Sequence, residues 1–239
     1  ISKKNYKEKL TDIEVLHDTE TINSVENILN YNFLVSSDRK KYGEIAPLTI
    51  DKDNYSFNET IYRTIKDSKD YTLRIQDIIN VAKEKGREYQ PQVPLTLFGR
   101  YSRKDVCRLL NWANDEKGTI YGYRLKHNSL PIFITYEKDD ELNSDVHYAD
   151  EIINTDTIKW YSRSNQTTQS KEIKDILESQ IKGTAKIYIF VKKNDSEGSD
   201  FYYLGNASID LDTVKDEVVE NHKSDKSYNV VSMNLILKN

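Results

Sequence analysis

Two prolines, Pro91 and Pro94, divide the chain into two stretches of different character. Proline lacks a backbone N–H and fixes φ, so two prolines in close succession interrupt both helices and strands. The stretch before them is polar and has helical periodicity, whereas the stretch after them is rich in tyrosine and in short apolar runs. We therefore expect a helical linker or coupling subdomain at residues 1–90 and a second domain at residues 91–239.

The stretch before the prolines contains two runs with helical spacing. Residues 13–29 and residues 71–85 both repeat apolar side chains at intervals of three and four positions. Gly86 follows the second run and favours a helix end there. Between the two runs, the polar cluster at residues 51–58 predicts a loop.

The stretch after the prolines begins with a helix and continues with strands. Ser102 is a natural N-cap for a helix over Arg103–Trp112. Ser170 is the expected cap of another helix, over residues 170–180. The β-rich runs lie at 119–125, 131–137, 158–164, 186–193, 200–209 and 230–237, and turn-forming residues separate them at 128–129, 139–144 and 197–199. Short strands with turns between them favour a compact barrel or sandwich, so the fold class is α+β.

The amino-acid composition limits the cellular and chemical context. A single cysteine, Cys107, excludes an internal disulfide framework and fits a reducing, cytoplasmic compartment. Its apolar neighbours predict a buried structural thiol rather than a nucleophile. No apolar run is long enough to cross a bilayer, so we expect no membrane partner. The chain begins at Ile1 and its only methionine is Met233, which favours a fragment of a longer polypeptide.

The charge distribution bears on nucleic-acid binding. A net charge of −4 argues against a protein that coats DNA without preference for particular sites. Basic residues outnumber acidic ones from Tyr101 to Lys126, whereas eight acids stand against Lys138 from Glu137 to Asp156. The basic strip is compatible with an edge that faces phosphates, and an ordinary mixed surface explains it equally well.

The sequence contains no clear catalytic motif. There is no phosphate-binding loop of the GxxxxGK type and no HExxH zinc motif. The acidic run Asp139–Glu141 is better explained as a solvated turn than as a metal site. His147 and Asp150 have the chemistry of a general base and its orienting carboxylate, but no nucleophile is linked to them. We therefore expect no enzymatic activity, cofactor or metal in this fragment.

Several runs occur in an order that resembles one protein family. They are YSRKDVCRLLNW, GTIYGYRL, PIFITYEK, YADE, WYSRSNQT, IYIFVKKND and EGSDFYYLG. Together they resemble the C-terminal domain that follows a phospholipase-D-type nuclease and a superfamily-2 helicase in bacterial, ATP-dependent type IV restriction enzymes of the SauUSI kind. The resemblance covers Leu97–Ile209 well, and the stretch before it less distinctively.

The resemblance implies an SRA-like fold, a curved β-barrel with flanking helices. Such a domain extrudes a C5-methylated cytosine from duplex DNA and holds it in a pocket, with hydroxymethylcytosine as an open alternative. The implied partners are methylated duplex DNA and the rest of the parent helicase–nuclease, which would serve phage defence. The nuclease and ATPase motifs are not in this chain, so neither activity is carried over.

A flipped base needs stacking faces, a group that reads its Watson–Crick edge and a small apolar notch for the methyl group. The aromatic residues that we expect to form this cage are Tyr121, Tyr123, Tyr136, Tyr148 and Trp160. Asp150 would accept a hydrogen bond from cytosine N4. Alternate strand residues share a face, so Tyr121 should lie beside Tyr123. Gly122, on the other face, would allow a close backbone approach. For each aromatic residue taken singly, a place in the core is the simpler explanation.

A polar loop follows the predicted strand at 158–164. Its residues, Ser162, Arg163, Ser164, Asn165 and Gln166, suit contacts with phosphates or the gap that a flipped base leaves behind. Further contacts to the DNA backbone are expected from Arg103, Lys104 and Arg124.

Two other functions stay open. One is a protein-interaction or dimerisation module of the helicase–nuclease, which the acidic pI of about 5.7 and the helical first stretch favour. A homodimer is compatible with this role and with DNA reading. The other is a free-standing hydrolase, supported only by the HYADE run and the acidic turn.

Overall fold

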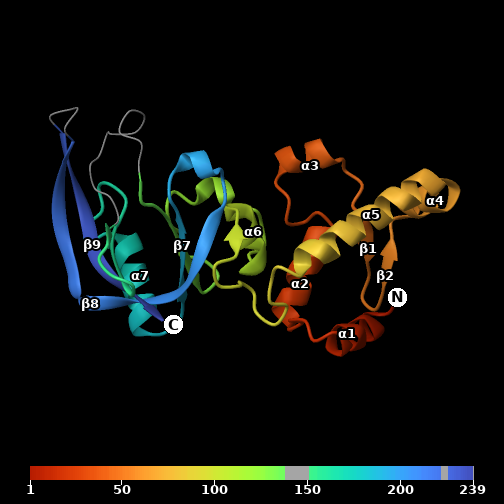
Figure 1. Ribbon diagram of the computed structural model, residues 1–239, viewed down its shortest axis with the longest axis horizontal. Helices are drawn as coiled ribbons and strands as arrows, with labels where there is room; N and C mark the ends of the chain where they lie inside the picture. Colours follow the sequence, from red (N-terminus) through yellow and green to blue (C-terminus); the bar gives the residue numbers. More distant parts are fainter. Residues whose placement is uncertain (138–150, 222–225, 239) are drawn as a thin grey trace. The chain divides into compact units, whose positions relative to one another are not determined.

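The computed structural model describes residues 1–137, 151–221 and 226–238 (Figure 1). The chain forms two compact units. The first unit is Ile1–Gly99 with Lys104–Lys117, and the second is Arg100–Arg103 with Gly118–Asn239. The segment Lys104–Lys117 therefore packs with the first unit, although it follows the proline pair in the sequence.

The first unit consists mainly of helices. They are α1 (Lys3–Asp12), α2 (Thr19–Leu29), α3 (Ser36–Tyr42), α4 (Glu59–Asp67), α5 (Lys69–Gly86) and α6 (Arg103–Leu109), whose first residue is counted with the second unit. A small antiparallel hairpin joins β1 (Leu48–Ile50) to β2 (Tyr55–Phe57). The core of this unit includes the fully buried side chains of Phe33, Val106, Cys107 and Trp112, so the prediction of a buried thiol is confirmed.

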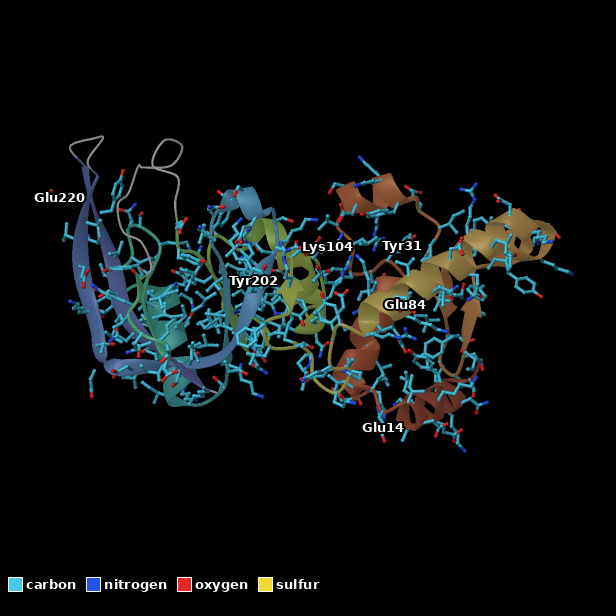
Figure 2. All side chains as sticks on the ribbon, in the orientation of Figure 1. Glu14, Tyr31, Glu84, Lys104, Tyr202 and Glu220 are labelled. Atoms are coloured by element: carbon cyan, nitrogen blue, oxygen red, sulfur yellow. The ribbon has the colours of Figure 1, made fainter. Side chains whose placement is uncertain are left out.

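Local capping explains where the predicted helices begin and end. The run at 13–29 becomes helical only at Thr19, because the carboxylate of Asp18 caps α2 by accepting a hydrogen bond from the Thr21 N–H. Glu14, between α1 and α2, has a positive φ of 54°, so the helical backbone of α1 does not continue into α2. Figure 2 labels this residue. The run at 71–85 is helical throughout, and α5 ends at Gly86 as predicted.

The cluster at 51–58 is only partly a loop. Asp51 makes the turn by accepting hydrogen bonds from the backbone of Asp53 and Asn54 at 2.8 and 2.7 Å. Tyr55–Phe57 then returns as strand β2. The prediction missed this strand because three residues are too few to show alternation.

The second unit is built on one mixed sheet. Its elements are β3 (Arg100–Tyr101), η1 (Lys117–Thr119, whose first residue is counted with the first unit), β4 (Ser129–Thr135), β5 (Glu151–Ile152), β6 (Thr157–Tyr161), α7 (Lys171–Ile181), β7 (Lys186–Lys192), η2 (Asp195–Glu197), β8 (Phe201–Asn221) and β9 (Lys226–Lys238). The strand order is β4-β7-β8-β9-β6-β5, and β3 pairs with the start of β8. The β4–β7 pair is parallel and the other pairs are antiparallel. Among the described strands the pairing does not close, so the expected barrel is replaced by an open sheet.

The sheet has an apolar layer on each face. On one face, Ile187 and Ile189 of β7 belong to the same buried apolar cluster as Ile173 and Ile176 of α7. The residues between them in β7 point the other way. There the ring of Phe190 stacks on Phe133 at 4.8 Å between centroids. The residues of this second layer, called the aromatic face below, are Tyr101, Phe133, Phe190, Phe201 and Tyr203.

The predicted strand at 119–125 is wrong. Gly122 has a φ of 82° and breaks the extended backbone, so Tyr121 and Tyr123 do not share a face. A Cβ at Gly122 would meet no atom of this chain within 4 Å, so the φ value, and not crowding by another segment, accounts for a glycine here. The close approach of a base stays a prediction. The following turn has positive φ at both His127 and Asn128, as a tight hairpin turn requires.

The predicted helix Arg103–Trp112 is shorter than expected. It ends at Leu109, and Asn111 then takes a φ of 59°. Within the described ranges, no helix combines the length and apolar character that a membrane span requires.

Candidate nucleic-acid interface

Four side chains of the second unit form a cluster around the predicted polar loop, and they are called the Arg163 cluster below. They are Tyr123, Trp160, Arg163 and Glu172. The rings of Tyr123 and Trp160 meet edge to face, with 4.8 Å between centroids. The Arg163 guanidinium lies 4.4 Å from the centroid of Tyr123. Only 2% of Tyr123 and of Trp160 is exposed, so both rings belong to the core.

Arg163 connects the Tyr123 segment to helix α7. Its Nη2 donates to the carbonyl oxygen of Tyr123 at 3.1 Å and to Oε1 of Glu172 at 2.5 Å. The Tyr123 hydroxyl donates to the other oxygen of Glu172 at 3.2 Å. Burial, and after it the negative charge of Glu172, raises the pKa of Tyr123 to about 12. The hydroxyl therefore stays protonated and holds this bond at neutral pH.

The 162–170 loop leaves β6 in a fixed conformation. Ser162 is buried, and its Oγ accepts a hydrogen bond from the Val231 N–H at 2.8 Å. The Gln166 N–H donates to the carbonyl of Asn229 at 3.2 Å. Thr168 donates from its N–H and its hydroxyl to the carboxylate of Asp216, at 2.7 and 3.0 Å. Three attachments to the β8–β9 hairpin thus support one short loop.

Asn165 lies between these attachments. It is exposed and has a φ of 62°, a conformation that asparagine tolerates better than most residues. Ser164 and Gln166 on either side are partly buried. Asn165 therefore presents a short amide side chain to solvent on a supported backbone, and Gln169 is the other exposed amide of the loop.

The other predicted base-binding residues are not members of this cluster or lie outside the described residues. Tyr121 is 69% exposed and Tyr136 is 41% exposed, so both keep free ring surface. Tyr148 and Asp150 lie outside the described residues, as do His147 and the acidic run at 139–141. Tyr123 and Trp160 therefore offer no open ring face for stacking, because both side chains lie in the core.

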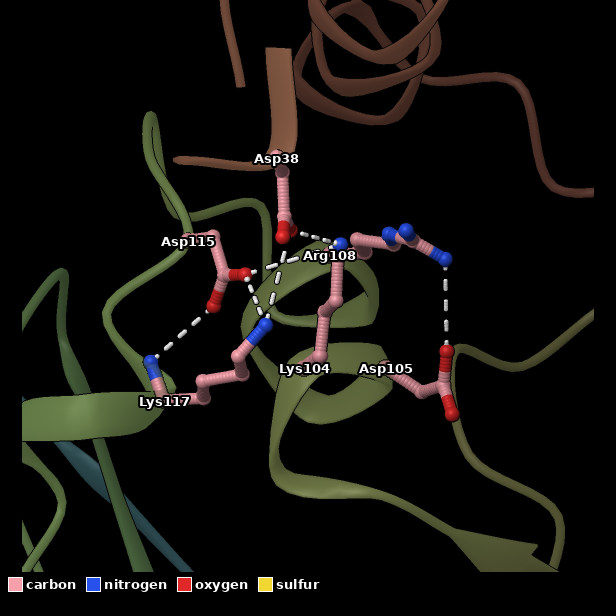
Figure 3. Close-up of polar contacts among 6 residues, drawn as sticks. All are labelled: Asp38, Lys104, Asp105, Arg108, Asp115 and Lys117. Carbon is pink, nitrogen blue, oxygen red and sulfur yellow. Dashed lines mark hydrogen bonds and ion pairs between the residues drawn. The ribbon is translucent and has the colours of Figure 1, made fainter. Parts of the chain in front are cut away.

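The predicted backbone contacts divide between the two units. Arg124 is partly buried and accompanies the Tyr123 segment. Arg103 belongs to the second unit and lies over the rings of Phe133 and Phe201. Lys104 belongs to the first unit, where Asp38 and Asp115 lie 2.5 and 3.7 Å from its Nζ (Figure 3). Because these carboxylates already balance its charge, the structure does not support Lys104 as a phosphate contact.

Sequence reasoning missed one member of the cluster. The segment that carries Glu172 has the features of an ordinary surface helix, and its partners Tyr123 and Arg163 are 49 and 9 positions away. No spacing rule connects such residues, so only the fold reveals the contact. In the part of the chain that the structure describes, no group of three or more His, Cys, Asp or Glu side chains is arranged to hold a metal ion.

The family comparison covers both parts of the chain. Residues 95–239 match the family described as a domain of unknown function, DUF3427. The chain belongs to this family. Residues 1–91 match a second family with the same description, DUF8090. The Arg163 cluster and the 162–170 loop lie entirely within the DUF3427 segment. No curated protein matches the sequence.

Three solved structures show limited similarity. The MspJI restriction endonuclease in complex with a 27-mer oligonucleotide has a TM-score of 0.37 and 11% identity, over 45% of this chain and 28% of MspJI. The DNA modification-dependent restriction endonuclease AspBHI has a TM-score of 0.43 and 11% identity, over 61% of this chain and 76% of AspBHI. SUVH6 of Arabidopsis thaliana, in complex with SAM, has a TM-score of 0.37 and 14% identity, over 92% of this chain and 40% of SUVH6. Scores this low do not establish a shared fold, and the match spans less than a third of MspJI.

Proposed function

We propose that the DUF3427 segment is an SRA-like module that recognises C5-methylated cytosine in duplex DNA by base flipping. In this proposal it is the specificity part of an ATP-dependent, modification-dependent restriction enzyme of the SauUSI kind, and it has no enzymatic activity of its own. The proposal joins the ordered motif resemblance over Leu97–Ile209 to the geometry of the 162–170 loop.

The supported Asn165 is the observation that carries the proposal. When a base leaves the duplex, a side chain must occupy the gap, and a loop that is already ordered pays less entropy on binding. Asn165 is a short amide on a backbone that Ser162, Gln166 and Thr168 attach to the hairpin. An amide can satisfy the hydrogen-bonding groups of the orphaned partner base.

The aromatic residues take different roles in this proposal. Tyr123 and Trp160 hold the loop from beneath, and the stacking faces come from the exposed rings of Tyr121 and Tyr136, together with Tyr148. Asp150 reads N4 of the cytosine. Stacking contributes about 1–3 kcal/mol per base, which offsets an unstacking cost of a few kcal/mol. Burial of the methyl group adds only about 0.8 kcal/mol, so the pocket must also exclude unmodified DNA by its shape.

Fluorescence polarisation with matched duplexes tests the proposal. The same sequence is titrated with cytosine, 5-methylcytosine or 5-hydroxymethylcytosine at one stated salt concentration, since phosphate contacts depend strongly on salt. We expect the methylated duplex to bind more tightly. Equal affinity for the methylated and unmodified duplexes would contradict the proposal.

A pair of loop variants locates the site. Asn165→Gly tolerates the positive φ and removes the whole side chain with its amide, so we expect roughly tenfold weaker binding of the methylated duplex, equivalent to about 1.4 kcal/mol. Gln169→Ala, at an exposed position of the same loop, is the matched control and should leave binding unchanged. Equal effects of both variants would argue against a specific role for Asn165.

A second candidate function, protein docking, is favoured by helix α5 in the first unit. None of its eighteen residues is buried, although Ile75, Ile78 and Ile79 follow helical spacing. Ile78 is 64% exposed and Ile79 is 42% exposed. An apolar helix face in water is typical of a partner-binding surface, and the partner we favour is a second copy of the chain.

Light scattering over a range of concentrations tests self-association. We expect a dimer that Ile78→Glu dissociates and that Asn80→Glu, a charge on the polar side of α5, leaves intact. A monomer at every concentration would contradict the docking function and would leave the DNA-reading proposal unaffected.

A further inference from the structure

Two cations lie against the aromatic face of the second unit. The Arg103 guanidinium is 4.9 Å from the centroid of Phe201 and 5.2 Å from that of Phe133. The Nζ of Lys192 is 4.8 Å from the same Phe201 ring, and the Lys192 side chain is only 7% exposed. One phenyl ring therefore attracts two positive charges.

The carboxylates near these two cations do not balance both positive charges. Asp195 pairs with Lys192 at 2.6 Å, and the Lys192 ammonium also donates to the carbonyl of Gly198 at 3.0 Å. Asp195 is also the carboxylate whose charge supports the protonated form of Arg103, while burial lowers the pKa of that guanidinium. The nearby Lys193 and Glu137 pair with each other at 3.4 Å and do not change the balance.

Arg103 forms no ion pair with any of the residues that the structure describes. No carboxylate of the described residues lies within 4.0 Å of its guanidinium, and its Nε is buried without a hydrogen bond. A buried cation normally has a counter-ion, because the loss of hydration is not otherwise recovered. Aromatic rings contribute only about 0.5–2 kcal/mol. Among the described residues, the buried Lys192 and the partly buried Arg103 thus share one carboxylate.

We propose that Arg103 and Lys192 form a binding site for a tetrahedral phosphate oxyanion. The planar fork of a guanidinium matches two oxygens of a phosphate, and the lysine supplies a point charge beside it. The oxyanion is a phosphodiester of nucleic acid or a free phosphate. This site is separate from the 162–170 loop, and it is indifferent to cytosine methylation.

Asp195 acts as an internal competitor at this site. Its side chain is 75% exposed, so it can leave Lys192 without disturbing the core. It comes from the short η2 turn, where Asn194 caps the backbone by accepting from the Ser196 N–H. An incoming phosphate would take the place of the Asp195 carboxylate on Lys192 and give Arg103 an anionic partner that the described residues do not supply.

Binding titrations with matched variants test the site. Two probes are used. Binding of inorganic phosphate is measured by calorimetry at constant ionic strength, and binding of one unmethylated duplex is measured by fluorescence polarisation. Arg103→Met keeps an apolar chain against the rings and removes the charge, so we expect loss of phosphate binding. Asp195→Asn should strengthen binding about threefold to fivefold, the range for a partly exposed ion pair. Lys171→Met, which removes a charge that is 90% exposed on α7, is the control.

The outcomes separate the sources of the oxyanion and decide the inference. If the variants change the affinity for the duplex alone, the ligand is a nucleic-acid phosphodiester. If they change the affinity for inorganic phosphate, the ligand is a free phosphate. Both results support the site. Arg103→Met should weaken methylated and unmethylated duplexes by the same factor, unlike a variant of the base pocket. If Asp195→Asn, an exposed change that leaves the fold intact, alters neither probe, the inference is overturned.

Discussion

The guanidinium of Arg163 lies 4.4 Å from the ring centroid of Tyr123, a residue 40 positions earlier in the chain. Glu172 binds both side chains, with one carboxylate oxygen on each. Because the three residues come from a loop, an irregular segment and a helix, their contact fixes the start of the 162–170 loop relative to α7.

Removal of Arg163 should destabilise the second unit. Arg163→Ala leaves Glu172 without its cation and the Tyr123 carbonyl without its donor, so we expect a loss of roughly 1–3 kcal/mol in the free energy of unfolding. About a third of each charged side chain is exposed, which favours the lower end of that range. Urea denaturation measures the change, and Lys171→Ala should stay within about 0.5 kcal/mol of the parent chain. An unchanged midpoint for Arg163→Ala would show that the cluster contributes nothing to stability.

Ser162 should be needed for loop order. Ser162→Ala removes the acceptor of the buried Val231 N–H, and an unsatisfied buried donor costs about 1–3 kcal/mol. We expect faster amide exchange at Val231 and weaker DNA binding. Ser164→Ala, two positions along the same loop and partly exposed, is the control for loss of a hydroxyl. Equal exchange rates in the two variants would contradict this assignment.

Trp160 and Tyr136 should respond differently to truncation. Trp160→Ala empties a core position and should cost about 3–5 kcal/mol of stability, so any loss of DNA binding follows from unfolding. Tyr136 is 41% exposed, and Tyr136→Ala should change stability by less than about 0.5 kcal/mol. If Tyr136 stacks on the flipped base, binding falls by about 1–3 kcal/mol. Full binding by a folded Tyr136→Ala variant would remove this tyrosine from the pocket.

Asp115 should be the most sensitive residue of the lysine–aspartate cluster in the first unit, which comprises Asp38, Lys104, Asp115 and Lys117 (Figure 3). Its side chain is completely buried, 3.0 Å from the Nζ of Lys117. Asp115→Ala leaves Lys104 and Lys117 to share the single carboxylate of Asp38 within this cluster, and we expect a loss of about 1–3 kcal/mol. Asp105→Asn, at a more exposed ion pair with Arg108, should cost less than about 1 kcal/mol. Thermal denaturation distinguishes the two, and similar melting temperatures would refute the assignment.

The same cluster predicts how stability depends on pH. The hydrogen bond from Lys104 lowers the pKa of Asp38 below its ordinary 3.8, so this contribution is present above that value and disappears as pH falls through the folded pKa. The hydrogen bond to Asp115 raises the pKa of Lys117 above its ordinary 10.5, so this contribution is present below that value and disappears as pH rises through the folded pKa. We expect a stability plateau from about pH 5 to about pH 9.

A pH series of denaturation curves measures this dependence. Lys117→Met should flatten the alkaline limb and leave the acidic limb, which belongs to Asp38, in place. An alkaline limb of unchanged slope in the variant would show that other groups cause it.

The periodicity of apolar residues was sufficient to predict α5, α7 and β7, because a regular element repeats its apolar positions locally. It was insufficient for the segment at 119–125, where strand propensity competes with the backbone break at Gly122. The length of β8 was also underestimated. Its second half, beyond Asp210, continues through a bulge and pairs with β9, and that pairing is not visible in either strand alone.

The sequence by itself determined the change from a helical to a β-rich stretch at the proline pair, most of the regular elements, and the polar character of the 162–166 run. Proline chemistry, capping and periodicity are properties of neighbouring residues, so they can be read along the chain. Only the tertiary structure decided that Tyr123 and Trp160 fill the core, that Glu172 completes the Arg163 cluster, and that Lys104 is bound to Asp38 and Asp115. These outcomes depend on which distant side chains share a low-dielectric environment, and the order of residues does not contain that information.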